Sequence, residues 1–167
     1  MAKTLATTLR LALSGSYINA LDNSSPVDRL DYTIDDTLAT GDGADQAELL
    51  WHDRRTLAAT SEELDLAASL TDAFGATLTF ATIKGIVIYN RSTTTAENLT
   101  VGGAASDTLD SFFGDATDTV TIGPSGCLFL WNPKDGYTVT ASTGDKLKID
   151  SGAATVIYDI VVIGTSA

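Results

Sequence analysis

The sequence predicts an all-β protein, a jelly-roll-like β-sandwich with one or two short helices and an extended N-terminal arm. The first observation behind this prediction is that short segments of alternating or β-branched residues recur along the whole chain. The second is that Gly-, Pro- and Asp-rich turns separate the C-terminal segments every eight to twelve residues or so, a spacing typical of sandwiches and jelly rolls. The third is length, because 167 residues suit one such domain.

The segment Thr82–Asn90 is the densest β-branched and aromatic run in the middle of the chain. Ile86 and Ile88 would face one side of a strand there, and Val87 and Tyr89 the other. A strand that is apolar on both sides is typical of a buried position, so we expect this segment to be the central strand. The segments before and after it are expected to form one sheet each.

Residues 1–27 are predicted to be an N-terminal arm or edge strand. Leu5, Leu9 and Leu11 lie in an alternating stretch whose period of two fits a half-buried strand. The same pattern fits an arm that pairs with the sheet edge of a neighbouring chain. Arg10 interrupts this stretch, so we expect no secretion signal there.

Residues 28–167 are predicted to form a single β-sandwich domain. Its first strand, residues 28–37, would turn Leu30, Tyr32 and Ile34 toward the core. The final strand, near residues 155–163, is as hydrophobic as the central one and is expected to pair along both edges.

The strand predicted over residues 48–57 carries Trp51, Arg54 and Arg55, the one cationic spot of an acidic chain. Polar residues fall on both of its faces, which does not suit a monomer core. We therefore expect this strand to lie at a contact between subunits.

Two short helical elements are predicted. Leu70–Gly75 looks like one helical turn closed by a glycine. Ser106–Gly114 places Leu109, Phe112 and Phe113 at helical spacing, as expected for a small helix that caps the core.

The charge balance argues against nucleic acid and membrane partners. Ten basic and 22 acidic residues give a net charge of −12 and an isoelectric point near 4.1. Such a surface repels phosphate backbones and anionic lipid. No apolar run is long enough to span a bilayer, and the single Cys127 is expected to be a small core residue.

No catalytic, cofactor or metal site is predicted. The one histidine, His52, could act as a catalytic base, but the sequence has no Gly-x-Ser-x-Gly motif that would supply a nucleophilic serine for it. Two alternatives stay open: a carboxylate pair of the kind that glycosidases use, and calcium binding by the acidic loop from Asp35 to Asp45, which lacks EF-hand spacing.

Five runs between residues 55 and 90 resemble small β-rich virion proteins of tailed bacteriophages: Arg55-Thr56-Leu57-Ala58-Ala59, Glu63-Leu64-Asp65-Leu66, Leu70 to Gly75, Leu78-Thr79-Phe80 and Ile83 to Asn90. In size, acidity and Thr/Gly-rich strands the chain is most similar to capsid decoration, or cement, proteins. The resemblance implies a jelly-roll-like structural protein, made in the host cytoplasm and seated on the outer capsid surface. It also implies a homotrimer that binds the major capsid protein and stabilises the head.

The residues expected at interfaces are Leu5, Leu9, Leu11, Trp51, Arg54 and Arg55. An alternative function is a receptor- or carbohydrate-binding module of a tail or head fibre. Its binding platform would be built from Tyr89, Trp131 and Tyr137, and it requires those rings to be exposed.

Overall fold

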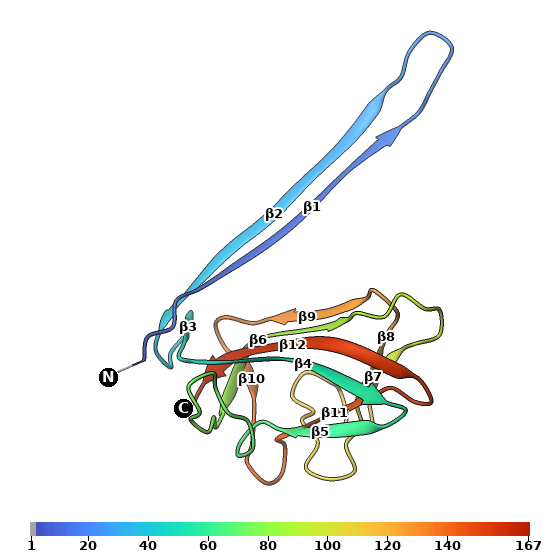
Figure 1. Cartoon of the computed structure of the whole chain (residues 1–167). Coiled ribbons are helices and arrows are strands. Elements are labelled where there is room, and N and C mark those ends of the chain that lie inside the picture. The colour runs from blue at the N-terminus through green and yellow to red at the C-terminus, as the bar shows by residue number, and fades with distance from the viewer. Residues whose placement is uncertain (1–2) are drawn as a thin grey trace.

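The computed structural model describes residues 3–167, and within them the chain is all-β with no helix. The described residues form twelve strands in three sheets. Two of the sheets pack face to face as a β-sandwich, and a long hairpin projects away from it (Figure 1). The predicted fold class is thus confirmed at the level of an all-β sandwich, whereas the two predicted helices are wrong.

The first sheet of the sandwich contains β6 (Thr82–Asn90) and β12 (Thr155–Thr165) at its centre. The strand β4 (Leu49–Ala58) flanks β12, whereas β9 (Cys127–Trp131) and β10 (Tyr137–Thr138) flank β6. All of these pairs are antiparallel. The prediction that β6 is central and that β12 pairs along both edges is confirmed.

The second sheet has the strand order β5–β11–β7–β8. Its members are β5 (Ser61–Asp65), β11 (Lys146–Asp150), β7 (Leu99–Gly102) and β8 (Thr119–Ile122). The expectation that segments before and after β6 form separate sheets is wrong, because each sheet mixes early and late strands. Strand pairing across such sequence distances depends on tertiary packing that local patterns do not encode.

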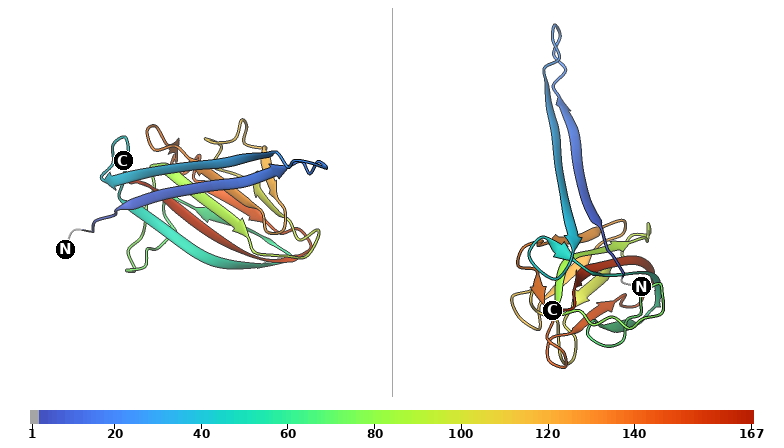
Figure 2. Two further views of the ribbon diagram at one scale, coloured as in Figure 1. Left: turned by 90° about the horizontal axis from the view of Figure 1, so that it is seen from above. Right: turned by 90° about the vertical axis from the view of Figure 1, so that its left-hand side faces the viewer.

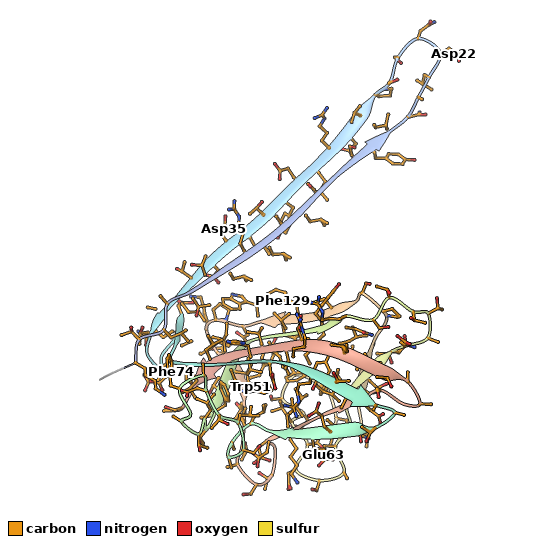
Figure 3. The ribbon with its side chains drawn as sticks, viewed as in Figure 1. Asp22, Asp35, Trp51, Glu63, Phe74 and Phe129 are labelled. Atoms are coloured by element: carbon orange, nitrogen blue, oxygen red, sulfur yellow. The ribbon has the colours of Figure 1, made fainter. Side chains whose placement is uncertain are left out.

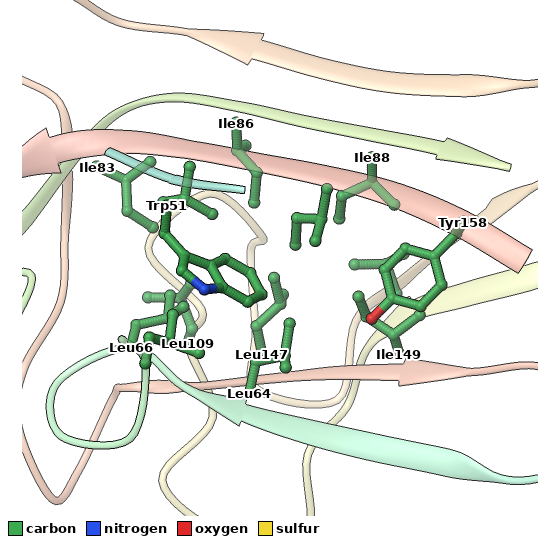
Figure 4. Close-up of a cluster of buried hydrophobic side chains, with 14 of the residues drawn as sticks. Trp51, Leu64, Leu66, Ile83, Ile86, Ile88, Leu109, Leu147, Ile149 and Tyr158 are labelled. Carbon is green, nitrogen blue, oxygen red and sulfur yellow. The ribbon is translucent and has the colours of Figure 1, made fainter. Parts of the chain in front are cut away.

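The core lies between these two sheets (Figure 4). Ile86 and Ile88 of β6 meet Leu147 and Ile149 of β11 there, and all four side chains are no more than 1% exposed. Full burial of one side chain of this size stabilises the folded state by about 1.5–3 kcal/mol relative to leaving it exposed. This core therefore supplies the stability of the sandwich.

The third sheet is the projecting arm, made of β1 (Thr7–Ile18) and β2 (Val27–Thr40), with the short β3 (Gln46–Ala47) beside the base of β2. The register of the hairpin runs without interruption from Thr7 opposite Leu38 to Ile18 opposite Val27. Figure 2 shows this arm from above and from the side. The predicted boundary between residues 27 and 28 falls at the start of β2, so the arm reaches to residue 40 rather than 27.

The inward orientation predicted for the apolar residues of β2 is wrong. Leu30, Tyr32 and Ile34 are 50%, 54% and 37% exposed. The alternation of the segment is as expected, but the strand pairs with β1 and not with the sandwich. A period of two identifies an apolar face and does not say what covers it.

The segment of the first predicted helix is held instead by hydrogen bonds from an aspartate side chain and between backbone groups of a loop. The Asp72 carboxylate accepts hydrogen bonds from the backbone N–H groups of Phe74 and Ala76, both at 2.9 Å. The N–H of Leu78 donates to the carbonyl of Leu70 at 2.8 Å. The segment Leu70–Gly75 is therefore part of a tight loop, because an aspartate that bonds to nearby N–H groups competes with helix formation.

The second predicted helix gives way to contacts with β11. The backbone N–H of Leu109 donates to the carbonyl of Lys146 at 2.9 Å, so Ser106–Gly114 stays extended where it meets that strand. The packing role expected for its apolar residues is observed, since Leu109 is fully buried and Phe112 and Phe113 pack against the core.

Candidate protein-interaction site

The arm has one apolar and one polar face. Residues directly opposite each other in an antiparallel pair share a face, so the register assigns every side chain. The apolar face of the arm, as we call it, comprises Leu9, Leu11, Leu13, Leu30, Tyr32 and Ile34, with Tyr17 opposite Asp28 near the tip. The other face carries small and polar residues such as Ala12, Thr33 and Arg10.

The apolar face of the arm is uncovered in the single chain. Leu13, Tyr32 and Tyr17 are 58%, 54% and 80% exposed, and the exposure extends over most of the arm. Figure 3 shows the side chains along the hairpin, from Asp35 to Asp22 at its tip, standing clear of the sandwich. A contiguous exposed apolar surface of this kind marks a site of interaction with another molecule.

The base of the arm is attached firmly to the sandwich. The indole Nε1 of Trp131 donates a hydrogen bond to Oδ2 of Asp36 at 2.9 Å. The ring of Trp131 lies over Gly85, where an added Cβ would come within 2.7 Å of the indole. Lys134 and Asp45 add an ion pair at 2.8 Å. These contacts fix the direction in which the arm leaves the body.

The sandwich presents a second uncovered apolar surface on the side of the first sheet that faces away from the core. We call this the outer sheet face, and it comprises Leu50, Val87, Phe129, Trp131, Val161 and Ile163. Leu50 is 36% exposed and the others are half-buried. Phe129 lies on the side of the sandwich toward the arm (Figure 3).

The two apolar surfaces meet only at the base of the arm. A small cavity of about 180 Å³ separates Thr7, Thr8 and Leu9 from the outer sheet face. Above this base, β1 and β2 diverge from the sheet (Figure 1). The result is a wedge with an apolar surface on each side.

A charged cluster marks the far end of the outer sheet face. The guanidinium groups of Arg54 and Arg91 share the single carboxylate of Asp159, at 2.7 and 2.8 Å. The Arg54 hydrogen bond, supported by Arg91, holds the pKa of the Asp159 carboxyl below its usual range. With two cations on one carboxylate, this exposed spot keeps a net positive charge.

The predicted interface residues separate into three groups. Leu9 and Leu11 lie on the apolar face of the arm, and Leu5 precedes it as a half-buried residue. Arg54 is exposed on the outer sheet face. Trp51 and Arg55 point the other way, because Trp51 is 6% exposed in the core (Figure 4).

Arg55 belongs to a polar network that closes the sandwich between β4 and β5. Its Nε donates to Glu62 Oε2 at 2.7 Å, while the hydroxyl of Tyr158 donates to Glu62 Oε1 at 2.7 Å. Burial, followed by the bond to Glu62, raises the pKa of the Tyr158 hydroxyl. The hydrogen bond to Glu62 likewise raises the pKa of Arg55. These groups are structural neighbours of the core.

The three aromatic residues considered for a sugar or receptor platform are not gathered together. All three are half-buried. Trp131 donates a hydrogen bond to Asp36, and Tyr89 lies near Arg91. Tyr137 packs edge-on against Phe112, with the ring centroids 5.6 Å apart. Among residues 3–167 these three rings therefore form no shared exposed surface.

Cys127 was expected to be a small core residue. It is instead exposed on β9.

An open groove of about 710 Å³ runs beside the free edge of β4, with Glu48, His52 and Asp72 among its lining residues. Glu48 accepts hydrogen bonds from Ser166, and the pKa of Asp72 is lowered by its bond to Lys3 and by backbone N–H groups. These two carboxylates are therefore engaged in local structure.

Residues 3–167 hold no group of three His, Cys, Asp or Glu side chains placed to bind a metal ion. In the acidic loop considered for calcium, Asp36 bonds to Trp131 and Asp45 to Lys134. The described chain also has no helix long and apolar enough to cross a membrane.

Val161, Ile163 and Phe129 were not expected on an outer sheet face, although the sequence of β12 is apolar on both sides of the strand. No known protein family matches the chain, and no curated protein sequence matches it.

Proposed function

We propose that the chain is a non-enzymatic capsid decoration (cement) protein of a tailed bacteriophage. It would be made in the host cytoplasm, bind the major capsid protein on the outer surface of the head, and stabilise that head as a homo-oligomer, with a homotrimer as the expected form. A jelly-roll strand order is part of the same proposal. The observation that carries it is the projecting arm.

The arm supports this function because β1 offers an open strand edge. Over its 12 residues β1 pairs only with β2 within the described chain. Its other edge presents main-chain N–H and C=O groups that a strand of another protein can satisfy by β-augmentation. An arm that extends away from the sandwich can reach a neighbouring subunit while the body stays outside.

Charge supports the same location. A net charge of −12 repels packaged DNA, so an acidic protein fits the outside of a shell. The exposed Arg54 and Arg91 offer one local attraction to acidic protein surfaces.

The test is binding to empty shells made of the major capsid protein of the same phage. We expect the full chain to sediment with the shells at a fixed ratio and to raise their temperature of disruption. As a control, residues 9–36 are replaced by Asn-Gly, which joins Thr8 to its register partner Thr37 through a tight turn. This shortened variant should stay in the supernatant. A full chain that never binds such shells overturns the proposal.

A further inference from the structure

We propose that the arm of one chain lies with its apolar face on the outer sheet face of a second copy of the same chain. The occupant of the wedge is therefore a second protomer, and each copy both gives an arm and receives one. The proposal concerns the faces of the strands, so the open edge of β1 stays available to other partners.

The sequence of the central strands indicates that a layer is missing from the single chain. In β12, Val156, Tyr158, Ile160 and Val162 face the core, whereas Val161 and Ile163 face outward. Strands that are apolar on both faces belong in sheets covered on both sides. Within residues 3–167 only the base of the arm covers this outer face.

The arm of the same chain does not supply that layer. Its direction is fixed at the base by the bond from Trp131 to Asp36 and by the ion pair of Lys134 with Asp45. From Leu11 outward its apolar residues are exposed. Two apolar surfaces held apart on one molecule can both be buried when the arm of one copy meets the sheet of another.

The dimensions of the two surfaces agree. The exposed part of β1, from Leu11 to Ile18, is about 26 Å long, and a two-stranded ribbon is about 10 Å wide, so the arm offers about 260 Å². The 11 residues of β12 give the receiving sheet a length of about 35 Å. When each copy contributes one arm and one sheet, each buries about 520 Å², and the total of about 1,040 Å² reaches the roughly 1,000 Å² expected of a specific interface.

The charges are also complementary. The apolar face of the arm carries Asp28 near its tip. The outer sheet face carries Arg54 and Arg91 around the lone Asp159, which leaves one positive charge without a carboxylate. A carboxylate from an arriving arm would meet this need, whereas an apolar or basic partner would not.

The experiment uses two full-length variants, each with one damaged surface. Leu13→Asp places a charge on the apolar face of the arm, and Val161→Asp places one on the outer sheet face. We expect the wild-type chain to self-associate with a micromolar or tighter dissociation constant, measured by sedimentation velocity across a concentration series. Each variant alone should lose about 30-fold or more in affinity.

Mixing the two variants gives the decisive result. The Val161→Asp chain has an intact arm and the Leu13→Asp chain has an intact sheet, so one good contact forms between them. We expect a heterodimer of one copy of each, detected by titrating a fluorescently labelled variant with the other to its highest soluble concentration. Homo-association of either variant at wild-type strength would show that arm packs on arm or sheet on sheet, and would overturn the proposal.

Matched controls exclude trivial loss of folding. Ala12→Asp lies on the opposite face of the same arm, and Thr121→Asp lies on the exposed side of β8 in the second sheet. Both should self-associate like the wild type. If Val161→Asp unfolds, Phe129→Asp on β9 takes its place.

A wild-type chain that stays monomeric at every concentration overturns the proposal and leaves the wedge to a different protein. This outcome is separate from the proposed function. A chain that self-associates but does not bind shells would keep the arm exchange and remove the capsid role.

Discussion

The arm and the central strands of the sandwich both carry apolar strand faces, on one side of the arm and on both sides of β6 and β12, but these faces have opposite environments. Ile88 of β6 is fully buried, whereas Leu13 of β1 is 58% exposed. The central strands pair on both edges and pack against a second sheet. Along the arm above its base, β1 and β2 pair only with each other in the part of the chain that the structure describes, and no layer covers their apolar face. The difference shows that an apolar strand face is favourable to bury, but that its sequence pattern does not specify which chain covers it.

The largest expected effect is the difference in stability between two variants, one that truncates a buried side chain of the sandwich and one that truncates an exposed side chain of the arm. We expect Ile88→Ala to lower the free energy of unfolding by about 3 kcal/mol, because it leaves a cavity in a packed core. In dilute protein, Leu13→Ala should change that free energy by less than about 0.5 kcal/mol. Urea denaturation of both variants measures the difference. Equal losses would mean that the arm packs against its own body.

The next prediction concerns the polar network under β12. Tyr158→Phe removes the hydrogen bond to Glu62 and should cost about 1 kcal/mol at neutral pH. The pKa of Tyr158 is raised in the folded chain, mainly by burial. Below about pH 10 the hydroxyl is protonated in both states, so it adds no pH dependence there.

Above pH 10 the unfolded chain loses the Tyr158 proton while the folded chain keeps it. The free energy of unfolding of the wild type should therefore fall with rising pH by about 1.4 kcal/mol per unit from this group. Tyr158→Phe should lack this part of the slope in urea titrations between pH 9 and 11. An identical slope in both proteins would contradict the raised pKa.

A smaller effect is expected at the junction of the two regions. Trp131→Phe removes the hydrogen bond to Asp36 and should cost about 1 kcal/mol or less in the free energy of unfolding, because the half-buried Asp36 carboxylate can then bond to water. The clearer signal is local: amide hydrogen exchange in β1 and β2 should become faster, while exchange in β6 and β12 stays the same. Unchanged exchange in the arm would show that other contacts hold its base.

The smallest effect is expected at the exposed cationic spot. Arg54→Gln removes one of two cations from Asp159, and because the pair is exposed, the stability measured by thermal unfolding should match that of the wild type. A large loss of stability would indicate that this ion pair is structural rather than part of an interaction surface.

Several features could be predicted from the sequence because they depend on local pattern. The β-branched run of Thr82–Asn90 and the two-sided apolar strand near the C-terminus identified the central strands, and both are central in the sheet. The N-terminal alternation identified a strand that behaves as an arm. Leu9 and Leu11, expected at an interface, lie on its apolar face.

Other features were decided only by the tertiary structure. Residues 28–37 have the pattern of a core strand, yet they form half of the arm because β2 pairs with β1. Trp51 was expected on a surface and lies in the core, since its strand turns this residue toward the second sheet. Helical spacing in Ser106–Gly114 gave way to backbone bonds with β11.

The sequence by itself determined which residues form strands and which face of each strand is apolar, since side-chain alternation is a local property of the backbone. Only the tertiary structure decided which strands pair and which apolar faces remain uncovered. That decision depends on contacts between residues far apart in the chain, as between β4 and β12 or between Trp131 and Asp36. It is these long-range contacts that leave the arm and the outer sheet face facing solvent.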